Sequence, residues 1–265
     1  MKVRYVDVHC HIQFDNYAHD KGSVIARMKD EEVAGIIVGV DIESSEKAIA
    51  LAQKYEHLFT SVGLHPNYVP QESFDQKEFY ALAAHSKVVA IGECGLDYYR
   101  PADVNDQVKR KQKEILQKHI ELAAAFDKPL IIHARPSKGT MDAYRDLIEI
   151  LKEAKAAHSN IRGDIHFFVG GINEAEALFA LDFSISFTAV ITFARDYDAV
   201  IRAAPLTRIM AETDAPYVAP ASRRGQRNDP LAVIDVVAKI ADIRSEDPEI
   251  VRTELLANAR RVFSL

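Results

Sequence analysis

Short apolar segments rich in β-branched residues alternate with longer amphipathic segments along the whole chain. Each apolar segment has the length of one strand in a globular protein, about 3–10 residues. A strand followed by a helical segment, repeated from end to end, is typical of a parallel sheet covered by helices. The predicted strands are Val3–His9, Gly35–Val40, Phe59–Gly63, Val88–Glu93, Leu130–His133, Gly163–Phe167, Phe183–Phe187 and Arg208–Glu212.

The segments between these strands show helical periodicity. In one of them Ala48, Leu51, Ala52 and Tyr55 recur at spacings of three and four residues, which places them on one face of a helix. The same pattern predicts helices at Ser44–Tyr55, Asp106–Phe126, Met141–Ala156, Pro230–Ile243 and Asp247–Phe263.

Eight strands are enough to close a parallel sheet into a (β/α)8 barrel. The chain has 265 residues, an ordinary length for this TIM barrel, which takes about 250. No composition shift or low-complexity run marks a boundary, so we expect one barrel domain over residues 1–265. An open, doubly wound sheet is the alternative. The Arg- and Pro-rich segment Pro216–Asp229 is predicted to be a surface loop beside the site.

The composition excludes several classes of protein. Apolar residues make up 48% and charged residues 27%, as in a globular chain rather than a disordered one. No apolar run approaches the roughly 20 residues of a membrane span, and Asp7 and His9 interrupt the apolar N-terminal segment where a secretory signal would lie. The two cysteines are too few for a disulfide framework. We therefore expect a cytoplasmic protein without membrane association. The sequence implies no obligate protein partner, and a monomer is the default expectation.

The net charge of −6 argues against a protein that coats nucleic acid, because such domains are usually strongly basic. It does not exclude an enzyme that acts on nucleic acid. Bound divalent cations dominate the local field of a site regardless of the net charge of the chain.

Ionisable side chains gather where the predicted strands end. Half of the ten histidines stand at or just past a strand end, and two carboxylates take equivalent positions. In a parallel barrel these ends meet at one mouth, where active sites lie. Imidazole and carboxylate groups are standard ligands of divalent metals. The sequence therefore predicts a metal site at the mouth, formed by His9, His11, Glu93, His133, His166 and Asp214.

The first strand ends in His9-Cys10-His11. Side chains two residues apart on a strand share a face, so both imidazoles can chelate one ion while Cys10 points the other way. Cys94 stands opposite Glu93 by the same reasoning, and we expect both cysteines to be buried packing residues. Asp7 is either a partner that fixes an imidazole tautomer or a buried acid with a structural hydrogen bond.

Six ligands exceed the four of a tetrahedral ion, which favours two divalent ions with Glu93 as the bridging carboxylate. Two ions roughly 3.5–4 Å apart can activate water and clamp the entering and leaving oxygens. The ions could be Mg²⁺, Mn²⁺ or Zn²⁺, although the four imidazoles suit Zn²⁺ or Mn²⁺ better than Mg²⁺, which prefers oxygen. The alternative is a metal held for structure alone, but such sites are usually closed and tetrahedral.

At these residues the sequence resembles the TatD family of metal-dependent deoxyribonucleases. The matching motifs run in family order across nearly the whole chain. They are Asp7-Val-His-Cys-His11, Gly63-Leu-His-Pro66, Ile91-Gly-Glu-Cys-Gly-Leu-Asp-Tyr98, Pro129-Leu-Ile-Ile-His-Ala-Arg135, Glu212-Thr-Asp-Ala-Pro-Tyr217 and Arg224-Gly-Gln-Arg-Asn-Asp-Pro230.

The resemblance implies a TIM barrel that hydrolyses phosphodiester bonds of DNA with two divalent ions. It implies one ion held by His9, His11, Glu93 and Asp214, and a second held by Glu93, His133 and His166. Asp214 and Glu93 would be the catalytic carboxylates, with Asp214 as the general base. The residues implied to face the scissile phosphate are His65 and Arg135, whose guanidinium can bind it through two hydrogen bonds.

The chain departs from the family pattern at two places. The sixth strand ends in His166-Phe-Phe-Val-Gly-Gly171, so Val169 stands where the family usually has a polar residue. Ala134 stands where a Ser or Thr is common. Both departures leave the predicted ligands intact and affect the expected substrate contacts.

The expected substrate is single-stranded DNA, cleaved exonucleolytically. Arg223, Arg224 and Arg227 crowd the loop after the eighth strand, and we expect Arg224 and Arg227 in particular to hold the phosphate backbone. The alternative for this loop is a solvated charged surface. Tyr98 and Tyr99 either stack on bases or pack under a loop.

Two rival functions remain open at the level of sequence. The same site could hydrolyse another ester, as in TatD-like proteins that resemble D-aminoacyl-tRNA deacylases, because a fold does not decide its substrate. The absence of a lysine at the fifth strand end, where His133 stands, argues against amidohydrolases that bridge their metals with a modified lysine. A non-enzymatic metal-binding protein is the second rival.

Overall fold

The computed structural model describes residues 2–100 and 104–265. Within these residues eight strands form one sheet in the order β1-β2-β3-β4-β5-β6-β7-β8, and each strand pairs in parallel with the next. The strands are β1 (Tyr5–Cys10), β2 (Val33–Val38), β3 (Leu58–Val62), β4 (Val88–Asp97), β5 (Leu130–Arg135), β6 (Gly163–His166), β7 (Phe183–Phe187) and β8 (Ile209–Ala211).

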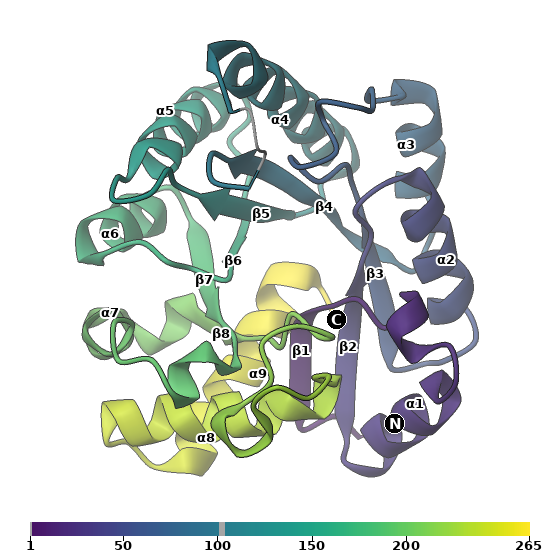
Figure 1. The fold of residues 1–265 in the computed structure, drawn as a ribbon, viewed down its shortest axis with the longest axis vertical. Coiled ribbons are helices and arrows are strands. Elements are labelled where there is room, and N and C mark those ends of the chain that lie inside the picture. The colour runs from purple at the N-terminus through teal and green to yellow at the C-terminus, as the bar shows by residue number, and fades with distance from the viewer. Residues whose placement is uncertain (1, 101–103) are drawn as a thin grey trace.

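Helices follow the strands and surround them (Figure 1). They are α1 (Lys21–Asp30), α2 (Ile42–Ala52), α3 (Gln76–Ala83), α4 (Asp106–Phe126), α5 (Asp142–Ala157), α6 (Ile172–Ala180), α7 (Asp198–Ala203), α8 (Val233–Arg244) and α9 (Pro248–Phe263). Short 3₁₀ segments are η1 (Asp15–Tyr17), η2 (Ala189–Thr192), η3 (Leu206–Arg208), η4 (Ala221–Arg223) and η5 (Pro230–Ala232). None of the described helices is long and apolar enough to cross a bilayer.

The sheet closes between β1 and the segment after β8. The backbone N–H of Asp214 donates to the carbonyl of His9 at 2.9 Å, and the N–H of His11 donates to the carbonyl of Ala215 at 2.7 Å. Cys10 and Ala215 form a parallel bridge. The predicted (β/α)8 barrel is therefore confirmed, and the alternative of an open sheet is wrong. The seam that closes the barrel lies among residues expected to bind metal.

Two apolar clusters hold the barrel together. The larger one lies between the strands and the surrounding helices. The smaller one fills the inside of the barrel, where Val8, Ile36, Ile131 and Met210 meet from different strands, and where Phe263 of α9 joins them. Helix α9 thereby covers the end at which the strands begin, so the mouth at the opposite end is the open one.

Two strands carry a β-bulge where a predicted ligand stands. Between Asp7 and Cys10, three residues of β1 pair with two residues of β2. Between Ile91 and Cys94, three residues of β4 likewise pair with two residues of β5. A bulge changes which side chains face inward. Because of the bulge in β1, the adjacent side chains of Val8 and His9 both face the inside of the barrel.

Most predicted elements are confirmed within one to four residues at their ends. The largest difference is in β4, which continues through its bulge to Asp97 rather than ending at Glu93. The segment Pro230–Ile243 begins as the 3₁₀ segment η5 before α8 starts. Helices α1, α3, α6 and α7 were not predicted, because segments of 6 to 10 residues show too few periodic positions.

His119 of α4 joins the helix layer to the loop that follows β3. Its Nδ1–H donates to the carbonyl of Ile115 at 2.8 Å, and its Nε2 accepts the backbone N–H of Leu64 at 2.9 Å. The ring is fully buried, and this burial lowers the pKa of His119 to about 4. The neutral imidazole therefore fixes the residue immediately before His65 at the mouth.

We expect His119 to make the protein less stable in mild acid. Its pKa in the folded state lies below the value of 6.5 in an unfolded chain, so its contribution is complete above pH 6.5 and is lost as the pH falls toward 4. The loss amounts to about 3 kcal/mol of the free energy of unfolding. Urea unfolding between pH 4 and 7 measures it, with His119→Gln as the non-titrating control. Equal pH dependence in both proteins would contradict this role.

Candidate metal centre

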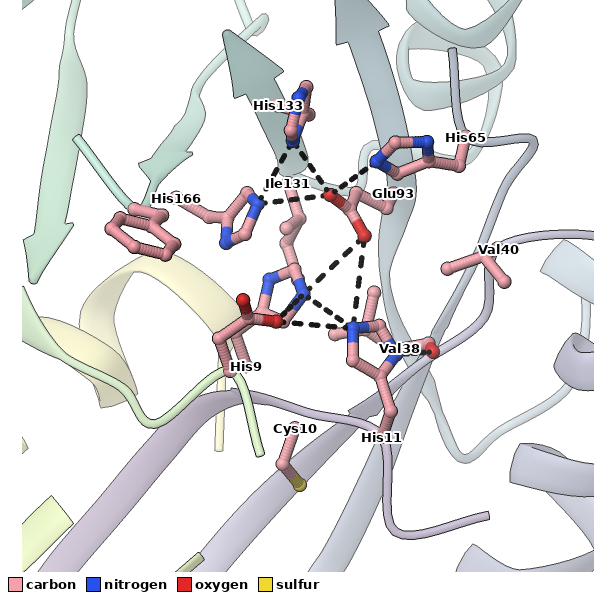
Figure 2. Close-up of polar contacts among 12 residues, drawn as sticks. His9, Cys10, His11, Val38, Val40, His65, Glu93, Ile131, His133 and His166 are labelled. Atoms are coloured by element: carbon pink, nitrogen blue, oxygen red, sulfur yellow. Dashed lines mark hydrogen bonds and ion pairs between the residues drawn. The ribbon is translucent and has the colours of Figure 1, made fainter. Parts of the chain in front are cut away.

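The mouth of the barrel holds a cavity of about 300 Å³. Of the six predicted ligands, His9 lies buried beneath the cavity and the other five line its wall. Figure 2 shows the imidazoles of four strand ends converging on one carboxylate, that of Glu93. The structure therefore brings the six predicted residues together, and it adds His65 to the same group.

Glu93 stands at the centre and divides the group into two donor sets. Its Oε2 lies 3.5 Å from Nε2 of His9 and 3.9 Å from Nε2 of His11. Its Oε1 lies 3.2 Å from Nδ1 of His133 and 2.9 Å from Nε2 of His166. One carboxylate thus offers a different oxygen to each pair of histidines, which is the geometry of a bridging ligand.

Asp214 completes the first donor set. Its Oδ1 lies 3.5 Å from Nε2 of His11 and 3.9 Å from Nε2 of His9. The two Nε2 atoms are 3.1 Å apart. In the second set, Nδ1 of His133 and Nε2 of His166 are 3.4 Å apart.

These spacings fit divalent cations. Ligand atoms about 2.0–2.1 Å from an ion at tetrahedral angles are about 3.3 Å from one another, and the donor atoms of both sets are separated by 2.9 to 3.9 Å. The Nε2 atoms of His9 and His11 face each other across 3.1 Å, a spacing at which both can coordinate the same cation.

Hydrogen bonds behind three of the rings direct the opposite nitrogen toward the centre. Nδ1–H of His11 donates to the carbonyl of Val38 at 2.9 Å. Nε2–H of His133 donates to Asp97 at 3.0 Å, and Nδ1–H of His166 donates to Glu212 at 3.2 Å. Such partners fix the tautomer of a metal ligand and make it more basic.

Glu212 supports one histidine of each donor set, a role that sequence reasoning missed. The oxygen that accepts from His166 also lies 3.7 Å from Nδ1 of His9, a buried atom with no hydrogen bond. The two rings stack with their centroids 3.8 Å apart. The other oxygen of Glu212 accepts from Ser186 at 3.0 Å and from the backbone N–H of Phe167.

Asp7 serves the barrel seam rather than an imidazole. Its carboxylate accepts from the side chain of Thr213 at 2.6 Å and from the backbone N–H groups of Thr213 and His9. The bulge between Asp7 and Cys10 ends the simple alternation that would place Asp7 beside the ring of His9. Of the two roles considered for Asp7, the structure shows the structural hydrogen bond.

His65 differs from the other rings at the centre. Its Nδ1 accepts the backbone N–H of Asn67 at 3.0 Å, so the proton sits on Nε2. That N–H points at Oε1 of Glu93, 3.2 Å away. In this tautomer His65 is a hydrogen-bond donor toward the centre, whereas His133 and His166 present lone pairs.

Burial and charge set the protonation of the cluster together. Burial alone would raise the pKa of Glu93, but the facing imidazoles, His65 and His166 first, hold it well below its usual range. Burial would lower the pKa of His166, yet Glu93 and Glu212 raise it well above its usual range. Without a cation, the two carboxylates therefore favour the protonated form of His166. Metal binding must displace such protons, because coordinated imidazole is neutral.

Cys10 and Cys94 are fully buried free thiols in the cluster between strands and helices. Burial raises the pKa of both thiols. Their predicted packing role is confirmed, and Figure 2 shows Cys10 pointing away from the centre.

The predicted phosphate-binding arginines are placed differently from one another. Arg135 lines the cavity. Arg224 stacks on Phe193, with its guanidinium carbon 3.8 Å from the ring centroid, and does not line the cavity. Arg227 donates to Asp20 at 2.8 Å and to the carbonyl of Asn16, so a structural ion pair already holds it. Arg100, which the sequence did not single out, lines the cavity.

Comparisons with known proteins all relate this chain to metal-dependent hydrolases and TatD homologues. Residues 6–264 match the family model described as TatD related DNase. YabD of Bacillus subtilis, an uncharacterized metal-dependent hydrolase, is 34% identical over 98% of both chains. YcfH of Escherichia coli K12, named in the same way, is 31% identical over 98% of this chain and 96% of its own. The crystal structure of the E. coli TatD homologue YjjV has a TM-score of 0.89 at 28% identity and covers 100% of both chains.

A TIM barrel whose mouth gathers imidazoles and carboxylates around one buried glutamate defines a metal-dependent hydrolase, the class to which its relatives are assigned. Within that class, this chain belongs to the TatD-related DNase family.

We expect the carboxylates behind the rings to have separable effects on metal binding. Glu212→Gln removes the charge behind His9 and His166, whereas Asp97→Asn removes it only behind His133. Losing such a partner typically weakens metal binding about 10- to 100-fold. Titration calorimetry with Zn²⁺ or Mn²⁺ measures these affinities. We expect Glu212→Gln to weaken binding of both ions and Asp97→Asn to weaken binding of only one of them. A Glu212→Gln isotherm identical to that of the wild type would refute its supporting role.

Proposed function

We propose that this protein is a deoxyribonuclease that uses two divalent ions to hydrolyse phosphodiester bonds of single-stranded DNA from a strand end. One observation carries the proposal: two donor sets share Glu93 and open into a cavity that Arg135 also lines. Paired cations beside a fixed guanidinium suit an anionic substrate that passes through a more highly charged transition state. The description of the matching family model, TatD related DNase, supports DNA as the substrate.

In this proposal His9, His11, Glu93 and Asp214 hold one ion, and Glu93, His133 and His166 hold the other. When bound, such ions lower the pKa of water and polarise the phosphate. The second set has three protein ligands, which leaves positions for substrate and water, as is usual in catalytic sites. The ions are Mg²⁺, Mn²⁺ or Zn²⁺, with the four imidazoles favouring the transition metals.

Asp214 is the proposed general base. Its side chain is 14% exposed, against 4% for Glu93, so it is the carboxylate of the two that a water molecule in the cavity reaches more readily. Its pKa lies below the usual range: burial would raise it, but the hydrogen bond to His11 and the charges of His9 and His166 outweigh that effect. Asp214 is thus ionised, as a general base must be before it takes up a proton, while Glu93 lies between the two donor sets.

His65 and Arg135 are the proposed phosphate contacts. His65 directs an N–H into the site, and Arg135 follows His133 by two residues on the same strand, so both side chains face the mouth. Arg227 has its guanidinium committed to Asp20, and the proposal assigns it no phosphate contact.

The size of the mouth supports a single strand as substrate. The cavity of about 300 Å³ lies at the lower end of the range for ligand pockets. Its lining includes aromatic side chains that can stack on unpaired bases: Phe14, Tyr68, Phe167, Tyr197 and Tyr217. A terminal nucleotide fits such a pocket better than a stacked duplex does.

The first test is hydrolysis of short single-stranded DNA by metal-stripped protein to which Mg²⁺, Mn²⁺ or Zn²⁺ is returned. We expect metal-dependent, stepwise shortening that is lost in His133→Ala and kept in His158→Ala, a matched change of an exposed histidine outside the mouth. Gel analysis of end-labelled DNA resolves each step. No cleavage by metal-loaded wild type would refute the proposal, and hydrolysis of an aminoacyl ester instead would redirect it to an ester substrate.

Asp214→Asn should separate chemistry from folding. The amide keeps the shape of the carboxylate but cannot take up a proton, so we expect the rate to fall at least about 100-fold with the thermal unfolding curve little changed. Metal content measured on the same samples shows whether the loss exceeds that caused by weaker binding. Near-wild-type turnover by fully metal-loaded Asp214→Asn would rule out its role as base.

A further inference from the structure

A second groove adjoins the cavity at the mouth. The two hollows share Arg135 and Val169, so they form one continuous surface. The groove runs from these residues over the loop between β5 and α5 and is bounded on one side by Tyr99. Its lining residues are Tyr99, Arg135, Pro136, Ser137, Lys138, Gly139, Thr140, Met141 and Val169.

Tyr99 is the aromatic surface of this groove. Its side chain is 51% exposed, and the guanidinium of Arg135 lies over its ring, 4.3 Å from the centroid. Its neighbour Tyr98 is 3% exposed and donates its hydroxyl hydrogen to Asp146. Of the two tyrosines, Tyr98 therefore packs inside the protein and Tyr99 is free to contact a ligand.

Tyr99 is held at a defined position relative to the metal centre. Oδ1 of Asp97 accepts the backbone N–H groups of Tyr99 and Arg100 at 2.9 and 2.8 Å. Oδ2 of the same carboxylate accepts from His133. The side chain that orients a proposed metal ligand thus also fixes the turn that carries Tyr99.

The groove is positively charged although the chain as a whole has a net charge of −6. Its described lining includes Arg135 and Lys138 and no acidic residue. The hydroxyls of Ser137 and Thr140 are engaged with Asp142, which begins α5. The polar groups left for a ligand are therefore the two cations, beside one exposed aromatic ring.

We propose that this groove binds the nucleotide adjacent to the one being cleaved, with its base stacked on Tyr99 and its phosphate held by Lys138, while Arg135, which both hollows share, stays with the reacting phosphate. An exposed aromatic ring next to cations, with no acidic residue in the described lining, matches a single-stranded polynucleotide, whose bases offer π-faces at regular intervals along an anionic backbone. The inference rests on the proposed function, because it assumes that a polynucleotide occupies the mouth. It adds the contact that binds the chain beyond the reacting phosphate.

The chain contains no tryptophan, which permits a direct test. In Tyr99→Trp the new indole is the only one, it retains the stacking surface, and a base stacked on it quenches its fluorescence. The probe is octathymidylate with phosphorothioate linkages, which resist hydrolysis, added to metal-loaded protein. We expect saturable quenching, and much weaker quenching by an octamer of the same length that lacks bases.

Ile250→Trp is the matched control. Ile250 is 63% exposed at the start of α9, where the ion pair of Glu249 with Arg4 places it at the closed end of the barrel. Its indole should not respond to the oligonucleotide. Tyr99→Leu should weaken oligonucleotide binding about 5- to 100-fold, while Tyr99→Phe keeps it. Anisotropy of a terminally labelled octamer measures both affinities.

The outcomes separate this inference from the proposed function. An oligonucleotide that binds without quenching the indole of Tyr99→Trp, or that does not bind at all, overturns the inference. Hydrolysis of unmodified octathymidylate by the wild type tests the nuclease function alone. Hydrolysis without quenching would support the nuclease function and refute the stacking site at Tyr99. Quenching without hydrolysis would support the stacking site and refute the nuclease function.

Discussion

The centre of this protein depends on one buried carboxylate that faces imidazoles on every side. Glu93 is 3% exposed, and its two oxygens lie within 4 Å of five histidines from four different strand ends. Ionised groups removed from water are stable only when opposite charges or cations accompany them. The close-set imidazole nitrogens and the central carboxylate together form groups of donor atoms that could hold a metal ion.

The fold serves this arrangement by delivering each group from a rigid element. The seam between β1 and the segment after β8 brings His9, His11 and Asp214 together through backbone hydrogen bonds. The bulges in β1 and β4 interrupt the regular alternation of side chains at His9 and Glu93. They change the direction in which these two side chains point. Around them, Glu212 and Asp97 accept hydrogen bonds from the rings that face Glu93. Strands and buried hydrogen bonds thus hold the centre, including His11 and Asp214, which stand just past the strand ends.

Much of this was accessible from sequence because strand ends in a parallel barrel share one face. Eight β-branched segments predicted the barrel, and histidines and carboxylates at their ends predicted which side chains meet. The short helices α1, α3, α6 and α7 gave too little periodicity to be found. Glu212 and Asp97 were also missed, because a charged residue inside a strand motif does not reveal which ring it will face.

The sequence by itself determined the architecture, the family and the identity of the converging side chains, since these follow from periodicity and from positions along strands. Only the tertiary structure decided their detailed roles. Arg227 reaches Asp20, about 200 residues away in the chain, and Tyr99 but not Tyr98 stays exposed. His65 becomes a donor because its Nδ1 accepts from Asn67. These outcomes depend on bulges, turns and distant partners, and a one-dimensional pattern does not encode distances between atoms.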